Sequence, residues 1–116
     1  MMNLQLKALK AIYDKKPHLV VKYISAGLTG NLLNYRDGIL LRSSITSNQP
    51  VIAKALLDAG ADGFVLRGEV FAAAFKQNNP ALIEIMRNWA VRNPSELNNI
   101  PGLSRKLGVV SVETRV

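Results

Sequence analysis

The side chains that could do chemistry are few and scattered along this 116-residue chain. The single histidine, His18, follows Pro17 in what would be the first turn of a helix, which fits a capping or surface role better than catalysis. Ser43 and Ser44 would act as nucleophiles only beside a base, and the one imidazole lies elsewhere in the sequence. The eight Asp and Glu residues show no paired spacing that nominates a general acid and base. We therefore expect no enzymatic activity.

Cofactor and metal sites are not indicated either. The chain has no cysteine, which excludes disulfides and thiolate metal sites and is compatible with a reducing compartment. The glycines of "SAGLTGNLL", residues 25 to 33, are not followed by the Gly-Lys-Ser/Thr sequence of a phosphate-binding loop. We expect no cofactor and no metal.

Membrane and secretion signals are missing from the sequence pattern. The N-terminal stretch has no continuous apolar core before a small-residue cleavage site, and no run approaches the roughly 18 apolar residues of a membrane span. We expect a soluble, unprocessed, cytoplasmic protein without a membrane partner.

Charge gives the main clue to a partner. The formal net charge is +7, and it is uneven, with +5 in residues 1–58 and +2 in residues 59–116. Such a field attracts an acidic protein surface or a nucleic acid. With only seven aromatic residues, most of them within apolar helix patterns, reading of bases is not expected. Binding to a phosphate backbone remains the alternative to an acidic protein partner.

The helical segments that would position these charged side chains recur at regular steps along the chain. Three prolines recur at steps of 33 and 30 residues: Pro17, Pro50 and Pro80. The residues expected to close the following helices keep the same steps: Gly27, Gly60 and Ala90. Proline suits a first helical turn and glycine suits the left-handed residue just past a helix, so each unit predicts a helix of about ten residues.

A second apolar segment precedes each proline, and the two later ones begin at Gly38 and Gly68, both 12 residues before the proline. The sequence therefore predicts one all-α domain of stacked helical hairpins with short connecting fingers. Its units would be residues 3–36, 37–66 and 67–93, followed by a C-terminal cap at 94–108 and a tail at 109–116. The second helices are apolar almost all round, which predicts packing on both sides.

The stretch "NQPVIAKALLDAGAD", residues 48–62, resembles the second helix and exit of an ankyrin repeat, with Gly60-Ala61-Asp62 as its most specific part. The 33-residue period agrees with that family, and a HEAT-like stack is the alternative. The family's Thr-Pro-Leu-His tetrad is replaced by "ILLR" at 39–42 and "EVFA" at 69–72. The resemblance therefore does not extend to the finger hydrogen bonds that this tetrad makes.

The resemblance implies a protein-binding module that uses the inner face of the first helices and the fingers. On that basis we expect a basic concave face that docks on an acidic partner, formed by Lys10, Tyr13, Tyr35, Arg36, Arg42, Thr46, Arg67 and Lys76. Such a module could inhibit or modulate a nucleic-acid-handling host protein, in a viral, phage or effector setting. Homo-oligomer formation through the apolar residues 64–66 is a further alternative.

Overall fold

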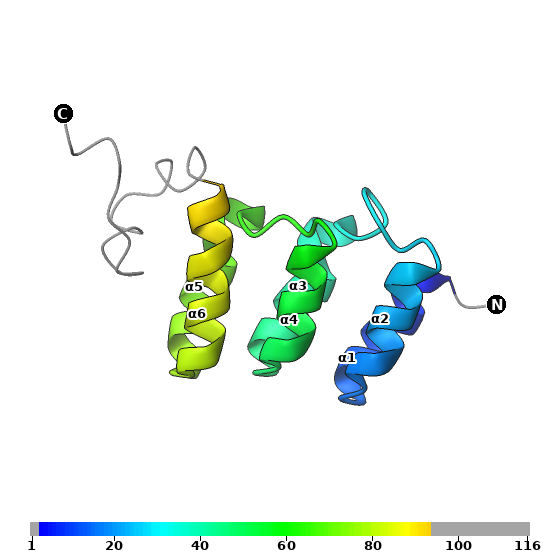
Figure 1. Ribbon diagram of the computed structural model, residues 1–116, viewed down its shortest axis with the longest axis horizontal. Coiled ribbons are helices and arrows are strands. Elements are labelled where there is room, and N and C mark those ends of the chain that lie inside the picture. The colour runs from blue at the N-terminus through cyan, green and yellow to red at the C-terminus, as the bar shows by residue number, and fades with distance from the viewer. Residues whose placement is uncertain (1–2, 94–116) are drawn as a thin grey trace.

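The computed structural model describes residues 3–93, which form helices and loops without a β-strand (Figure 1). The helices are α1 (Leu4–Tyr13), α2 (Pro17–Ser25), α3 (Tyr35–Thr46), α4 (Pro50–Asp58), α5 (Val65–Gln77) and α6 (Pro80–Arg92). The all-α prediction is thus confirmed for these residues. The predicted cap at 94–108 and tail at 109–116 lie outside the described part of the chain.

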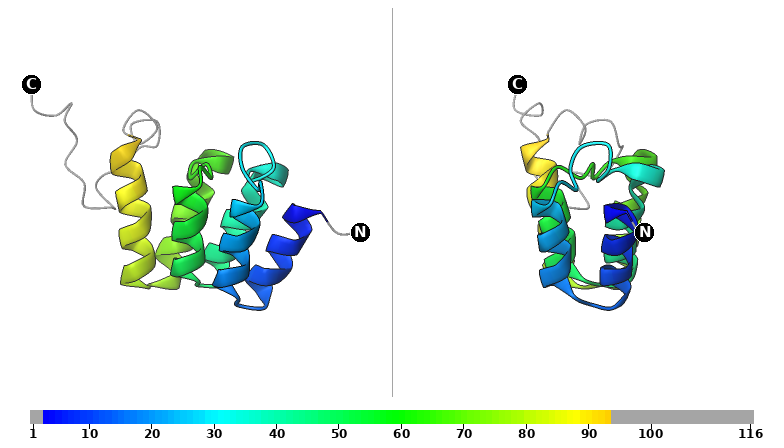
Figure 2. Two further views of the ribbon diagram at one scale, coloured as in Figure 1. Left: turned by 45° about the vertical axis from the view of Figure 1, so that its right-hand side comes forward. Right: turned by 90° about the vertical axis from the view of Figure 1, so that its right-hand side faces the viewer.

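The six helices form three hairpins placed side by side. Each hairpin pairs two consecutive helices, and neighbouring hairpins contact each other through α1, α3 and α5 in one row and α2, α4 and α6 in the other. Figure 2 shows these two rows most clearly in the view along the stack. The hairpin turns lie at one end of the helices and the finger loops that join successive hairpins, residues 26–34 and 59–64, lie at the other (Figure 1).

The three hairpin turns share one backbone conformation. In each, the residue two places before the proline is left-handed, with φ of 58° at Lys15, 57° at Asn48 and 54° at Asn78. The proline then occupies the first turn of the second helix, where its missing N–H costs no hydrogen bond. The predicted role of the three prolines is confirmed.

The ends of the second helices match the prediction in two hairpins and differ in the third. α2 and α4 are nine residues long and are followed by Gly27 and Gly60, at φ of 119° and 110°. α6 is 13 residues long and runs past the expected closing residue Ala90, which is buried. α6 continues through Ala90, because alanine is a strong helix former. Unlike glycine, it does not favour the left-handed conformation that ends a helix.

The first helix of the second hairpin begins with a left-handed turn, and that of the third hairpin contains one left-handed residue near its start. Arg36, Asp37 and Gly38 have φ of 52°, 55° and 71°, and Gly68 has φ of 81°. In both places the glycine N–H donates a 3.2 Å hydrogen bond four residues back, to the carbonyl of Asn34 or of Phe64. The right-handed part of each helix thus starts after the glycine that the sequence identified.

The core runs continuously between the two rows and ends in an aromatic cluster. Phe64, Phe71 and Trp89 pack with ring centroids 4.8 to 6.4 Å apart. A side chain at Gly63 would lie 2.8 Å from the Trp89 ring, so only glycine fits there without a shift. Phe64 is buried in this cluster, so its side chain offers no exposed apolar surface for a contact between copies of the chain.

The outer side of the second helices is open among the described residues. Val21 and Val51 are 48% and 67% exposed, whereas Val20, Ile52 and Leu82 are buried toward the first helices. α4 packs against α2 on one side and α6 on the other, as predicted for a middle layer, while the outward side of the second helices stays open among the described residues.

Candidate partner-binding face

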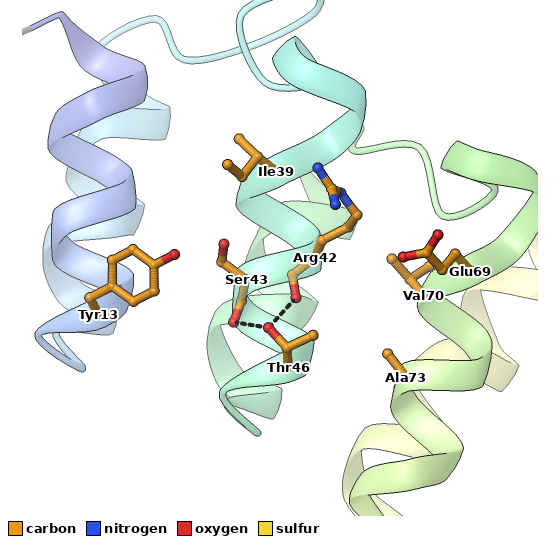
Figure 3. Close-up of a pocket in the computed structure, with 8 residues that line it drawn as sticks. All are labelled: Tyr13, Ile39, Arg42, Ser43, Thr46, Glu69, Val70 and Ala73. Carbon is orange, nitrogen blue, oxygen red and sulfur yellow. Dashed lines mark hydrogen bonds between the residues drawn. The ribbon is translucent and has the colours of Figure 1, made fainter.

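The first helices α1, α3 and α5 together form a surface that we call the first-helix face. A cavity of about 250 Å³ opens on it, centred on α3 (Figure 3). Its lining combines charged, hydroxyl and apolar side chains from all three helices: Tyr13, Ile39, Arg42, Ser43, Thr46, Glu69, Val70 and Ala73. Three of the predicted partner-binding residues, Tyr13, Arg42 and Thr46, are thus brought together around one hollow.

Helical spacing explains why these α3 residues share the face. Ile39, Arg42, Ser43 and Thr46 follow the i, i+3, i+4, i+7 pattern that places side chains on one side of a helix. The neighbouring helices align by the repeat, because residues 33 and then 30 positions apart occupy the same place in successive hairpins. Tyr13, Thr46 and Lys76 form one such row across the face.

Arg42 is held in place by the left-handed turn that opens α3. Its Nε donates to the carbonyl of Asp37 at 3.0 Å and its Nη2 donates to the carbonyl of Arg36 at 3.2 Å. These carbonyls are available because the left-handed residues do not continue the regular helical ladder. The guanidinium is therefore preorganised, and its other N–H donors remain for a partner.

Glu69 brings a negative charge to the same cavity. In Figure 3, Arg42 on α3 and Glu69 on α5 both extend into the space between these two helices. Glu69 is exposed, and it occupies the repeat position of Ile39 on α3. The cavity is therefore of mixed charge, and the positive face expected from the sequence contains one acidic residue.

The hydroxyl groups around the cavity have different degrees of freedom. Thr46 Oγ1 donates to the Arg42 carbonyl at 2.9 Å, so its oxygen is left chiefly as an acceptor. The Tyr13 side chain is 63% exposed and extends from α1 toward α3 (Figure 3). A ring that is both large and open to solvent can bury much apolar area and still form a hydrogen bond when a partner covers it.

Lys10 and Lys76 lie on the first helices but do not line the cavity. Lys10 Nζ donates to Asp14 Oδ2 at 2.7 Å, and this hydrogen bond raises the pKa of Lys10 and lowers the pKa of Asp14. Lys10 therefore stays cationic at neutral pH, although Asp14 offsets part of its field. Lys76 is exposed at the hairpin-turn end of α5.

The predicted finger residues lie at the other end of the helices. The Arg36 guanidinium is 5.9 Å from the centre of the Tyr35 ring, at the start of α3. Arg67 belongs to α5, but its side chain is outside what the structure describes. The predicted residues thus form two groups along the face, with Tyr35 and Arg36 at the finger end of the helices and Tyr13, Arg42 and Thr46 around the cavity. The hydrogen bonds of Arg42 to the carbonyls of Arg36 and Asp37 connect the two groups.

Sequence reasoning missed several cavity residues, namely Ile39, Ser43, Glu69, Val70 and Ala73. The repeat alignment carried a signal for Glu69, because a carboxylate there replaces the isoleucine of the preceding unit. The repeat alignment gave no indication that the small residues Ser43 and Ala73 line the cavity, since their contribution is only that short side chains leave the space unfilled.

Comparison with known proteins gives no match to a family model, to a curated protein or to a solved structure. Among the residues that the structure describes, no group of three or more His, Asp and Glu side chains is placed to hold a metal ion. None of the described helices is long and apolar enough to cross a membrane.

Proposed function

We propose that this chain is a non-enzymatic, ankyrin-like protein-binding module whose first-helix face docks on an acidic partner. The observation that carries the proposal is the convergence of Tyr13, Arg42 and Thr46 from two helices around one open cavity. Tyrosine and arginine are the residue types that most often dominate interface energetics. A preorganised arginine beside an exposed tyrosine supports such an interface, because little side-chain freedom is lost at Arg42 on binding.

The chemistry of the face refines the expected partner. Lys10, Arg42 and Lys76 favour carboxylates, while Glu69 favours a donor or a cation at the α5 side of the cavity. The partner would therefore present an acidic surface that also carries at least one hydrogen-bond donor. Occlusion of a nucleic-acid-binding site on a host protein, in a viral, phage or effector setting, would fit a small module of this kind.

The test is affinity capture by the full chain from nuclease-treated extract of its native cell. We expect one stoichiometric protein, whose affinity falls about tenfold or more with Tyr13→Ala or Arg42→Glu, as for central interface side chains. Lys54→Glu is the matched control, because it makes the same charge reversal at an exposed position of α4 in the other row.

Folding of each variant must be checked by circular dichroism, since Arg42→Glu also removes the bonds to the finger-end carbonyls. Arg42→Lys separates the two roles, because it keeps the charge and loses the fork geometry. Equal loss of the captured protein with Lys54→Glu, or full retention with Tyr13→Ala and Arg42→Glu, would remove the first-helix face as the binding surface.

A further inference from the structure

The first hairpin carries lysines where the later hairpins carry apolar or small residues. The repeat alignment gives three such sets: Lys7 with Leu40 and Val70, Lys10 with Ser43 and Ala73, and Lys22 with Ala55 and Ile85. In the third hairpin these positions face the preceding hairpin, because Val70 and Ala73 of α5 line the cavity shared with α3 and Ile85 of α6 lines a groove shared with α4. Leu40 and Val70 are buried, and Ile85 and Ala55 line one groove between α4 and α6.

At the first hairpin these positions have no described neighbour to cover them. Lys7, Lys10 and Lys22 are all exposed there, in contrast to their equivalents in the interior of the stack. We call this surface, with the adjoining turn residues Lys15 and Lys16, the end face.

Positive charge is concentrated in the hairpin that carries the end face. Residues 3–26 hold five lysines, all exposed, and a single acidic residue, Asp14. Elsewhere many basic side chains are paired, as Lys54 and Arg92 are with Asp58 at 2.6 and 3.7 Å. Among residues 3–93, no carboxylate lies within ion-pair distance of Lys7, Lys15, Lys16 or Lys22.

We propose that the end face binds the phosphate backbone of nucleic acid without reading its bases, as a second binding surface separate from the first-helix cavity. Lys7 and Lys10 are one helical turn apart, with about 5–6 Å between their Cβ atoms. A nucleic acid strand offers a negative charge at every nucleotide, so neighbouring lysines can each meet a phosphate. The hairpin holds no arginine, so it has no planar fork with which to read a guanine edge.

The experiment measures fluorescence anisotropy of a labelled oligothymidine and of a mixed-sequence duplex, each about 20 nucleotides long, titrated with the full chain between about 50 and 200 mM salt. We expect binding to both probes with a steep salt dependence. Lys7→Gln/Lys22→Gln should lower the slope of log affinity against log salt by about 1.4 on the single strand, and should weaken binding roughly tenfold at low salt.

The matched control is Lys54→Gln/Arg92→Gln, which removes the same net charge from exposed positions of the second and third hairpins. It should weaken binding by no more than about twofold, through the long-range field alone. The proposal is overturned if neither probe binds at the lowest salt, or if the control variant loses as much affinity as Lys7→Gln/Lys22→Gln. It is also overturned if polyglutamate displaces the probe as well as unlabelled oligonucleotide does at the same charge concentration. The last result would assign the end face to acidic proteins.

Discussion

At the scale of single residues, the left-handed positions of the hairpin turns show where the sequence is locally strained. Asn48 and Asn78 hold this position in two hairpins, and asparagine tolerates it better than most residues. Lys15 holds the same position in the first hairpin at φ of 58°, where its Cβ is close to the following carbonyl. The strain is therefore carried by one of three otherwise equivalent turns.

Lys15→Asn should stabilise the protein by about 0.5–1 kcal/mol, because it relieves part of the left-handed penalty at a position where the other turns have asparagine. Urea unfolding, followed by the fluorescence of the single tryptophan Trp89, gives the free energy of unfolding. Lys15→Gln is the control, because it loses the same charge but gains no left-handed preference. A gain of equal size with both variants would show that charge, and not backbone strain, limits stability here.

At the scale of the elements, polar side chains tie successive hairpins together at both ends of the helices. At the finger end, Asn34 Oδ1 accepts from the Asp62 N–H at 2.8 Å, and Asp62 Oδ1 accepts from the Phe64 N–H at 2.8 Å. At the turn end, Gln49 Nε2 donates to the Ile12 carbonyl at 2.6 Å and Gln77 Nε2 donates to the Thr46 carbonyl at 2.9 Å. These ties connect fingers and turns in a chain without the Thr-Pro-Leu-His tetrad.

Asn34→Ala should lower the free energy of unfolding by about 1 kcal/mol, because the Asp62 N–H loses its acceptor and the two finger loops lose their link. Asn31→Ala, at an exposed position of the same loop, should change stability by less than about 0.5 kcal/mol. Hydrogen exchange at Asp62 adds a local readout, and it should quicken only in the Asn34 variant. Unchanged exchange there would mean that the finger geometry does not depend on this bond.

At the scale of the whole molecule, the excess charge is concentrated in the first hairpin. The described residues after residue 26 carry seven basic and five acidic side chains, a net of +2, against +4 for residues 3–26. A stack of hairpins needs a polar end because its interior positions are apolar. Charged side chains at Lys7 and Lys22, where the next hairpin carries Leu40 and Ala55, disfavour apolar packing of a further layer on this hairpin.

Replacing Lys7 and Lys22 by the residues of the next hairpin, as Lys7→Leu/Lys22→Ala, should make the end face resemble an uncovered interior layer. We expect concentration-dependent self-association, measured by size-exclusion chromatography with light scattering. Lys7→Gln/Lys22→Gln removes the same charge and should remain as monodisperse as the parent chain. Identical behaviour of the two variants would show that hydrophobic exposure at this face does not drive association.

The sequence by itself determined the helices, their pairing into hairpins and most of their boundaries. These follow from local backbone chemistry, because proline fixes a first turn and glycine permits a left-handed residue wherever they occur, as at Pro50 and Gly60. The same local reasoning went wrong at Ala90, which has no such constraint, and α6 continues to Arg92.

Only the tertiary structure decided which side chains meet. Helical spacing indicated that Arg42 and Thr46 share a face, but the position of the Arg42 guanidinium depends on carbonyls exposed by a left-handed turn in the preceding residues. The entry of Glu69 into the same cavity depends on the contact between the second and third hairpins, and the burial of Phe64 depends on the packing of the finger loop against Trp89 of α6. Such contacts join residues about 25 to 30 positions apart, and the local rules that place helices carry no information about them.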